Sequence, residues 1–231
     1  MRLTSEDVVC CVPPLFHCFG LVMGFLSSFF HGSTCVFPSD DFNAERVVDA
    51  LVHERCTALL SVPTMFYAEL EVLARRKAKI STLRTGLAAG SAVPSALMGR
   101  LRDEMGVNGI LIAYGMTETS PVTFMPSLDD PEDKRLRSLG KVLPHTSAKI
   151  IDRNGNIVAR NTKGELCTSG YPLQKGYYNN EDKTREAMIR DGDGVLWMHT
   201  GDECYMDDQD YCYITGRFKD IIIRGMLSAI A

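Results

Sequence analysis

The sequence predicts an α/β fold: a mostly parallel sheet with flanking helices, followed by an antiparallel, β-rich subdomain shaped as a distorted barrel. Over residues 7–113, short apolar runs alternate with helix-length segments, a pattern typical of βαβ units. From Gly140 onward, short strand-like runs are separated by turns instead. We therefore expect an α/β subdomain at 1–137, a β-rich subdomain at 138–216, and a hinge with a divergent tail at 217–231.

The first half shows clear boundaries between its elements. Strands are expected at residues 7–12, 34–37, 57–62, 83–88 and 109–113. Asn43 is suited to cap the helix that follows the second strand, and Pro63 and Pro94 are suited to the first turns of the next two helices. The most apolar run, residues 18–30, is shorter than the roughly 20 residues that cross a membrane, so it predicts a buried core helix.

The second half is predicted mainly from its turns. Asn154-Gly155 is a strong hairpin signal between the expected strands 148–152 and 157–159. Further strands are expected at 165–169, 195–199 and 211–214, with a helix after Asn180. The charged run at 127–137 is expected to form a solvated surface loop.

Composition excludes several classes of protein. The formal charge of −4 and the pI of about 5.7 leave no basic face for nucleic acid. Eight cysteines in 231 residues are too few for a disulfide scaffold, so we expect reduced thiols in an intracellular protein. The sequence shows no signal-peptide pattern, membrane span or peroxisomal address. We predict a cytoplasmic location, and leave a mitochondrial or peroxisomal one open for a longer parent protein.

A polar loop follows the last strand of the first half, where a parallel sheet commonly binds its ligand. Gly115 lets the backbone approach a ligand closely, and Thr117 and Thr119 offer hydroxyl groups to a phosphate. Glu118 offers a hard oxygen ligand suited to Mg²⁺, and Tyr114 offers an aromatic face to a base. The alternative is an ordinary polar surface loop.

Two residues of the second half suit a ribose. Asp202, placed after Gly201, could accept hydrogen bonds from two neighbouring hydroxyls, although an ordinary β-turn is the alternative. Arg217 carries a guanidinium group that fits ribose or phosphate oxygens. The alternative for Arg217 is a surface ion pair with Asp210 or Glu203.

Small residues follow another strand of the first half. Ala89, Gly90 and Ser91 would leave room for a flat ring and expose backbone groups to its edge. A plain strand-to-helix turn before Pro94 explains the same residues, and both interpretations can hold.

Taken in chain order, these motifs resemble the adenylate-forming enzymes, and within them the acyl-CoA synthetases (AMP-dependent ligases). The matching segments are Pro13–Gly20, Ala88–Ser91, Tyr114–Ser120, Gly164–Leu166, Gly176–Asn180, Trp197–Asp202 and Gly216–Asp220. The resemblance covers residues 1 to about 225. The segment from Gly170 to Asn180 favours CoA ligases over the adenylation domains of peptide synthetases.

The resemblance implies a role for each matching residue. The residues implied to bind ATP or AMP are Ala89, Gly90, Ser91, Tyr114, Gly115, Thr117, Asp202 and Arg217. Among them, Tyr114 would stack on adenine, Thr117 would hold the α-phosphate, and Asp202 with Arg217 would hold the ribose.

The implied catalytic residues are Thr117, Glu118 and His17. Glu118 would bind Mg²⁺, and His17 would gate the acyl tunnel, although a satisfied core or strand-end histidine is the alternative. Asp220 would be the hinge of a C-terminal lid.

The implied reaction joins a carboxylic acid to CoA. The acid and ATP would give an acyl-adenylate and pyrophosphate, and the CoA thiol would then displace AMP. The Phe-rich segment 16–30 favours a fatty or similar hydrophobic acid. The alternatives are an aryl-acid ligase of the coumarate type and a non-catalytic AMP-binding or interaction module.

Two departures from the family pattern bear on activity. The sequence contains no Gly/Ser/Thr-rich phosphate loop ending in Lys, and the residues after Gly225 do not match the family's C-terminal domain with its catalytic Lys. We therefore expect a truncated central portion with reduced or no activity of its own. Core surface left uncovered in this way would favour self-association.

Overall fold

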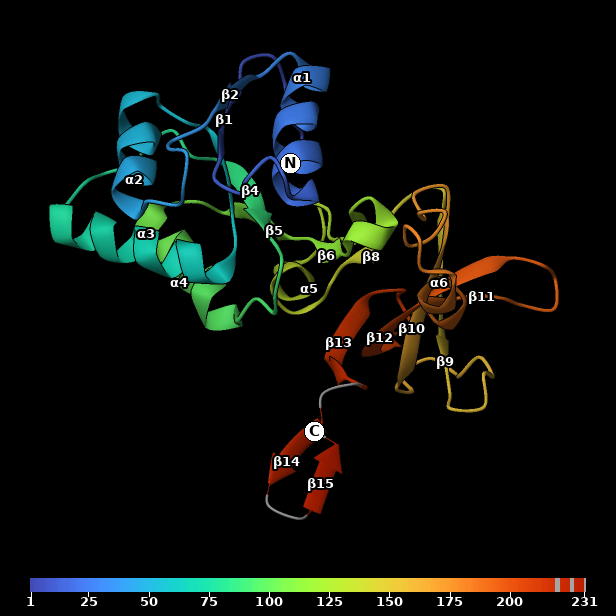
Figure 1. The fold of residues 1–231 in the computed structure, drawn as a ribbon. Helices are drawn as coiled ribbons and strands as arrows, with labels where there is room; N and C mark the ends of the chain where they lie inside the picture. The colour runs from blue at the N-terminus through green and yellow to red at the C-terminus, as the bar shows by residue number, and fades with distance from the viewer. Residues whose placement is uncertain (219–220, 225–226, 231) are drawn as a thin grey trace.

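A five-stranded parallel sheet organises the first half of the molecule (Figure 1). The computed structural model describes residues 1–218, 221–224 and 227–230. The strand order is β2-β1-β3-β4-β5. The strands are β1 (Val8–Cys11), β2 (Thr34–Val36), β3 (Ala58–Ser61), β4 (Thr85–Ala88) and β5 (Gly109–Ile112). Each lies within a segment predicted to be a strand, and all are paired in parallel, as the βαβ pattern predicts.

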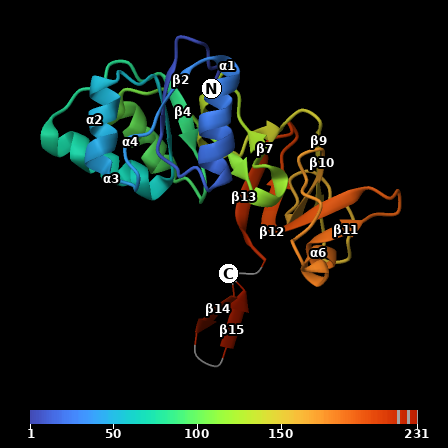
Figure 2. The ribbon, with the colours of Figure 1, turned by 45° about the horizontal axis from the view of Figure 1, so that its top comes forward.

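Helices cover both faces of this sheet. They are η1 (Phe19–Leu26), α1 (Ser27–His31), α2 (Ala44–His53), α3 (Pro63–Arg76) and α4 (Ser95–Met105). Figures 1 and 2 agree that α2, α3 and α4 lie on one side of the sheet and η1 with α1 on the other. The two buried clusters follow this division, with Leu59 facing α2–α4 and Leu60 facing Phe19 of η1.

The helix starts predicted at Asn43 and Pro63 are confirmed, whereas Pro94 is the N-cap of α4 and lies one residue before its first turn. The side chain of Asn43 accepts hydrogen bonds from the backbone N–H groups of Glu45 at 3.0 Å and Arg46 at 3.2 Å, which satisfies donors at the start of α2. Pro63 occupies the first turn of α3, where its missing N–H costs nothing.

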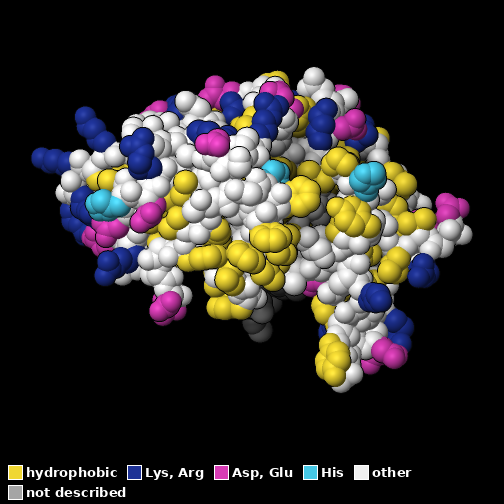
Figure 3. Space-filling view, turned by 90° about the horizontal axis from the view of Figure 1, so that it is seen from above, with side chains coloured by type: hydrophobic (Ala, Val, Ile, Leu, Met, Phe, Trp, Pro, Cys, Tyr) yellow, Lys and Arg dark blue, Asp and Glu magenta, His cyan; other side chains and the backbone are white. Residues whose placement is uncertain are grey.

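The apolar run at 18–30 is helical as predicted, but the prediction that it is buried is wrong for its outer face. It is wound as a π-helix over η1 and as an α-helix over α1. Gly24 lies so close to Cys11 that a Cβ would overlap the thiol sulfur, so this face packs tightly on the sheet. On the opposite face Phe29 is 77% and Phe30 84% exposed. Figure 3 shows hydrophobic side chains gathered near the middle of the face seen from above.

The second half is antiparallel, as predicted. Its main sheet has the order β11-β12-β10-β9, with β13 paired to β12. The strands are β9 (Thr146–Ile151), β10 (Gly164–Gly170), β11 (Met188–Arg190), β12 (Leu196–Met206) and β13 (Cys212–Arg217). The hairpin at Asn154-Gly155 is confirmed by the antiparallel bridge between Ile151 and Ile157. The helix after Asn180 is α6 (Glu181–Ala187), and the Asn180 side chain caps it.

Several short elements complete the fold. They are β6 (Tyr114–Gly115), η2 (Thr117–Thr119), β7 (Val122–Met125), β8 (Lys141–Val142), β14 (Ile221–Arg224) and β15 (Leu227–Ile230). Strands β6, β7 and β8 form a small sheet that lies between the two larger sheets in Figures 1 and 2.

The charged run at 127–137 is not a plain loop, so this prediction is wrong in part. Its second half forms α5 (Glu132–Arg137). Lys134 donates to Asp207 at 2.5 Å, and the Arg135 guanidinium donates to the backbone oxygen of Asn108 at 3.0 Å. Both partners lie outside the run, so the local sequence of the run alone predicts an exposed loop.

The eight cysteines are free thiols, six of them buried. In the part of the chain that the structure describes, no helix is long and apolar enough to cross a membrane.

Candidate functional site

The carboxyl ends of β4 and β5 bring two predicted segments together. The two strands are neighbours in the sheet, and the N–H of Ala113 donates to the oxygen of Ala88 at 3.0 Å. Ala89, Gly90 and Ser91 therefore begin beside Tyr114. Gly90 has a φ of +90°, a conformation that suits glycine, and both Gly90 and Ser91 are exposed. Their surface is open to a ligand.

The loop after β5 is tightly folded. A Cβ at Gly115 would overlap the carbonyl oxygen of Pro121, so only glycine fits there. Thr117 is exposed and Glu118 is half-buried. Thr119 differs from the prediction, because its buried hydroxyl accepts from the N–H of Met116 at 3.2 Å and donates to the oxygen of the same residue at 3.1 Å. Thr119 thus shapes the loop, and Thr117 is left to offer a hydroxyl.

His17 lies beside this loop. The Sγ of Cys18 is 3.6 Å from the Thr117 hydroxyl and 3.8 Å from Nδ1 of His17. The N–H of Phe19 donates to the same Nδ1 at 3.0 Å, so in the neutral imidazole Nε2 carries the proton. His17 is exposed, which excludes a core histidine.

Glu118 is held by a residue to which sequence reasoning assigned no role. The Tyr177 hydroxyl donates to Oε1 of Glu118 at 2.7 Å. Burial, reinforced by this carboxylate, raises the pKa of Tyr177 to about 12, so the hydroxyl remains a donor. The N–H of Gln174 also donates to the backbone oxygen of Glu118 at 2.9 Å. No described residue donates to the second carboxylate oxygen, a hard ligand of the kind that Mg²⁺ prefers.

A bulge in β12 presents Asp202. Glu165 pairs with Glu203 and Cys167 pairs with His199, so three residues of β12 lie opposite the single residue Leu166 of β10. The bulged residues are Thr200, Gly201 and Asp202, and Gly201 has a φ of +73°. Such a bulge re-aims a side chain out of the regular ladder. The Thr200 hydroxyl donates to the oxygen of Leu166 at 2.8 Å and accepts from the N–H of Asp202 at 3.1 Å.

Asp202 joins the two halves of the candidate site. Its Oδ2 accepts from the Tyr114 hydroxyl at 2.5 Å, and its Oδ1 accepts from Nε of Arg217 at 2.8 Å. Burial and the nearby Asp202 charge raise the pKa of Tyr114, so its hydroxyl stays protonated. Asp202 is 5% exposed, and each of its carboxylate oxygens has a hydrogen-bond partner that compensates for burial.

Arg217 forms an ion pair with a partner other than the two considered from sequence. Its partner is Asp202, to which it is the cross-strand neighbour. Asp210 instead pairs with Arg160, and Glu203 pairs with Lys163 at 3.3 Å.

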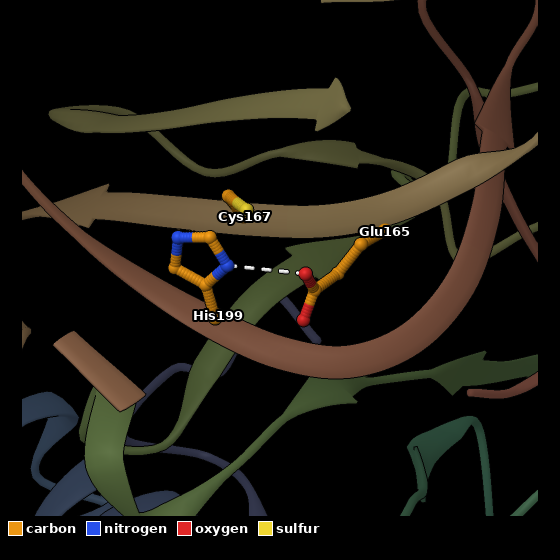
Figure 4. Close-up of side chains that lie close together, drawn as sticks. All are labelled: Glu165, Cys167 and His199. Atoms are coloured by element: carbon orange, nitrogen blue, oxygen red, sulfur yellow. Dashed lines mark hydrogen bonds and ion pairs between the residues drawn. The ribbon is translucent and has the colours of Figure 1, made fainter. Parts of the chain in front are cut away.

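Glu165 supports the bulge from behind. Its Oε1 accepts from the N–H of Gly201 at 3.0 Å, and its Oε2 lies 3.0 Å from Nδ1 of His199 (Figure 4). The motif Gly164–Leu166 signalled this position, but only the fold shows that its carboxylate holds the Asp202 turn. Asp220 lies outside the described residues.

Comparison with known proteins identifies the family. The model of the family described as AMP-binding enzyme matches residues 1–178, more than half of the chain. The chain belongs to the AMP-binding enzyme family. The resemblance of the motifs is thereby confirmed.

Relatives of this chain are named acyl-CoA ligases. It is 52% identical to the acyl-CoA ligase sidI of Aspergillus fumigatus over 97% of its length, and 51% identical to the acyl-CoA ligase cnsG of Penicillium expansum over 97%. The solved structure of the O-succinylbenzoate coenzyme A synthetase MenE from Bacillus subtilis, in complex with ATP and a magnesium ion, matches 100% of the chain with a TM-score of 0.80 and 28% identity.

The chain spans only part of each relative. It covers 38% of the Aspergillus ligase, 47% of the Penicillium ligase and 46% of the Bacillus synthetase.

Proposed function

We propose that this chain is the nucleotide-binding core of an ATP-dependent acyl-CoA ligase. The observation that carries the proposal is the position of Asp202, held between Tyr114 and Arg217 beside the open ends of β4 and β5. A carboxylate offers about four acceptor positions, and two of these are taken. The remaining lone pairs can accept the two hydroxyls of a ribose.

The neighbouring groups fit the rest of a nucleotide. Adenine would lie against Tyr114 and the small residues Ala89, Gly90 and Ser91, where a flat ring meets no long side chain. The Thr117 hydroxyl would donate to an oxygen of the α-phosphate. Glu118 would hold Mg²⁺ through the oxygen that Tyr177 leaves open. The ion, when bound, would neutralise charge on the phosphates.

The proposed reaction of the whole protein has two steps. The carboxylate of the acid attacks the α-phosphorus of ATP, the bond between the α-phosphorus and its bridging oxygen breaks, and pyrophosphate leaves. The thiol of CoA then attacks the acyl carbon and AMP leaves. Thr117 and Asp202 would fix the nucleotide during both steps, because positioning and electrostatic stabilisation supply most of the catalysis in phosphate chemistry.

We propose a fatty or similar hydrophobic acid as the substrate. His17 lies at the edge of the site, and the adjacent Phe16 is 94% exposed. An apolar acyl chain could be covered by such side chains. The aryl-acid alternative is tested by comparing thioester formation from a panel of aliphatic and aromatic acids.

Titration of AMP into the chain by calorimetry tests the nucleotide site. Asp202→Asn keeps the shape of the side chain and removes its charge. Loss of two charge-assisted hydrogen bonds should cost about 3 kcal/mol, or about a hundredfold in affinity. The matched control is Asp210→Asn, also in an ion pair with an arginine but on the exposed surface. Equal affinity of Asp202→Asn and the wild type would refute the proposed site.

We also propose that the exposed face of η1 and α1 mediates association between copies of this chain. Its support is the exposure of Phe29 and Phe30, because large apolar patches commonly mark interfaces. Phe29→Ser should raise the monomer fraction in light scattering at micromolar concentration. A wild-type chain that is already monomeric would contradict this proposal.

A further inference from the structure

Three potential metal ligands meet behind the Asp202 turn. Glu165 and Cys167 belong to β10, and His199 lies opposite Cys167 on β12. One ligand atom from each of the three lies within 4.8 Å of the other two. Figure 4 shows the thiol, the imidazole and the carboxylate facing a common space.

The ligand types favour a thiophilic cation. Thiolate, imidazole and carboxylate are the ligands that Zn²⁺ takes in proteins, with bond lengths of about 2.0–2.3 Å. In tetrahedral geometry such ligands lie about 3.5 Å apart, which small side-chain rotations can reach from the observed spacing. A buried thiolate disfavours Mg²⁺ and Ca²⁺, because these hard cations prefer oxygen. Cys167 is fully buried, whereas Glu165 and His199 are half-buried and leave an approach for the ion.

Metal binding would compete with contacts that the site makes now. Burial raises the pKa of Cys167 to about 12, so the thiol must release its proton as the metal binds. Glu165 must also exchange its hydrogen bond with His199 for the metal, and the same carboxylate holds the N–H of Gly201. Movement of Glu165 would therefore loosen the bulge that aims Asp202.

We propose that Glu165, Cys167 and His199 form a binding site for a thiophilic divalent cation of the Zn²⁺ class, and that its occupancy weakens nucleotide binding at Asp202. The effect on nucleotide binding rests on the proposed function, whereas the metal site does not depend on it. Because linkage is reciprocal, AMP must weaken metal binding by the same factor as the metal weakens AMP binding.

Titration with Co²⁺ tests the metal site, because a cobalt–thiolate bond gives a charge-transfer absorption that Zn²⁺ should abolish by displacement. The absorption should form in the wild type and in Cys18→Ser, which removes a second thiol lying near a histidine. It should be lost in Cys167→Ser. His199→Gln keeps the thiol and should bind Co²⁺ at least about tenfold more weakly than the wild type. This second variant tests the site if Cys167→Ser fails to fold. Absence of the absorption in the wild type, or its survival in Cys167→Ser, would overturn the site.

Calorimetric titration of AMP with and without saturating Zn²⁺ tests the coupling. We expect AMP to bind about tenfold more weakly to the metal-loaded chain. Equal AMP affinities would overturn the coupling and leave the cobalt result to decide the site. Failure of the metal-free chain to bind AMP would overturn the proposed function together with the coupling, while the cobalt absorption would still decide whether the metal site exists.

Discussion

The parallel and the antiparallel sheet layers each bury a carboxyl group, Glu69 of α3 and Asp202 of β12. Glu69 is 0% exposed, and its partner among the described residues is the Ser61 hydroxyl at 2.6 Å. Its Oε2 has no hydrogen-bond partner in the described part of the chain. Asp202 is 5% exposed but receives a hydroxyl and a guanidinium group. A carboxyl group that is buried without a charged partner is driven toward its neutral form and serves packing, as at Glu69. The Asp202 carboxylate, placed between a hydroxyl and a guanidinium group, keeps acceptor positions for a ligand.

The largest expected effect is the contribution of Glu69 to the pH dependence of the free energy of unfolding. Burial raises the pKa of Glu69 from 4.5 to about 8, so the folded chain keeps this proton where the unfolded chain loses it. The contribution to stability is full below the unfolded pKa and is lost as pH rises toward about 8. Titration of Glu69 should lower the free energy of unfolding by about 2 kcal/mol as the pH rises from 6 to 8.

Urea unfolding of Glu69→Gln at the two pH values checks this expectation. The variant should lose most of the pH dependence, because Gln does not titrate. Glu71→Gln is the matched control, since Glu71 lies on the same helix but is exposed and should leave the slope unchanged. An unchanged slope in Glu69→Gln would show that Glu69 is not the group responsible.

The next effect concerns the hydrogen bond that ties the two layers together. Tyr114→Phe removes the hydroxyl that donates to Asp202. A hydrogen bond to a charged group contributes about 1.5 kcal/mol, so the free energy of unfolding should fall by about that amount. Tyr171→Phe, at a tyrosine that is 80% exposed, should change the unfolding free energy little. Equal stabilities of the two variants would mean that Asp202 does not depend on Tyr114.

The smallest effect compares the helix caps of the two layers. Asn43 caps α2, which buries Val47, Val48, Ala50 and Leu51, whereas Asn180 caps α6, which buries none of its residues. Asn43→Ala should lower the free energy of unfolding by about 1 kcal/mol. Asn180→Ala should fray α6 locally, with a global change of only a few tenths of a kcal/mol. Equal losses in urea unfolding would contradict this comparison.

Local signals in the sequence predicted most of the fold. The five parallel strands are short apolar runs bounded by Pro, Gly or charged residues. Asn43 caps α2 as predicted, and a helix follows Asn180 as predicted. The prediction of burial for the apolar run at 18–30 and the prediction of a loop for the charged run at 127–137 were each wrong in part. In both, exposure depends on which distant elements cover the segment, and a local pattern carries no such information.

The candidate site shows the same limit. Its residues could be proposed from motifs, but their contacts join positions far apart in the chain. Tyr114 and Asp202 are 88 residues apart, and Glu118 and Tyr177 are 59 apart. Thr119 resembles Thr117 in sequence, yet only the folded loop shows that its hydroxyl is already used.

A crystal structure of the chain with AMP bound would test the central claim most directly. We expect the two ribose hydroxyls within hydrogen-bond distance of Asp202 and the adenine ring between Tyr114 and residues 89–91. The chain has another place where a ligand could settle, an open hollow of about 440 Å³ lined by Tyr177, Tyr178, Asn180, Lys183, Glu186 and Ala187. AMP bound in that hollow, with no ribose hydroxyl within hydrogen-bond distance of Asp202, would contradict the account.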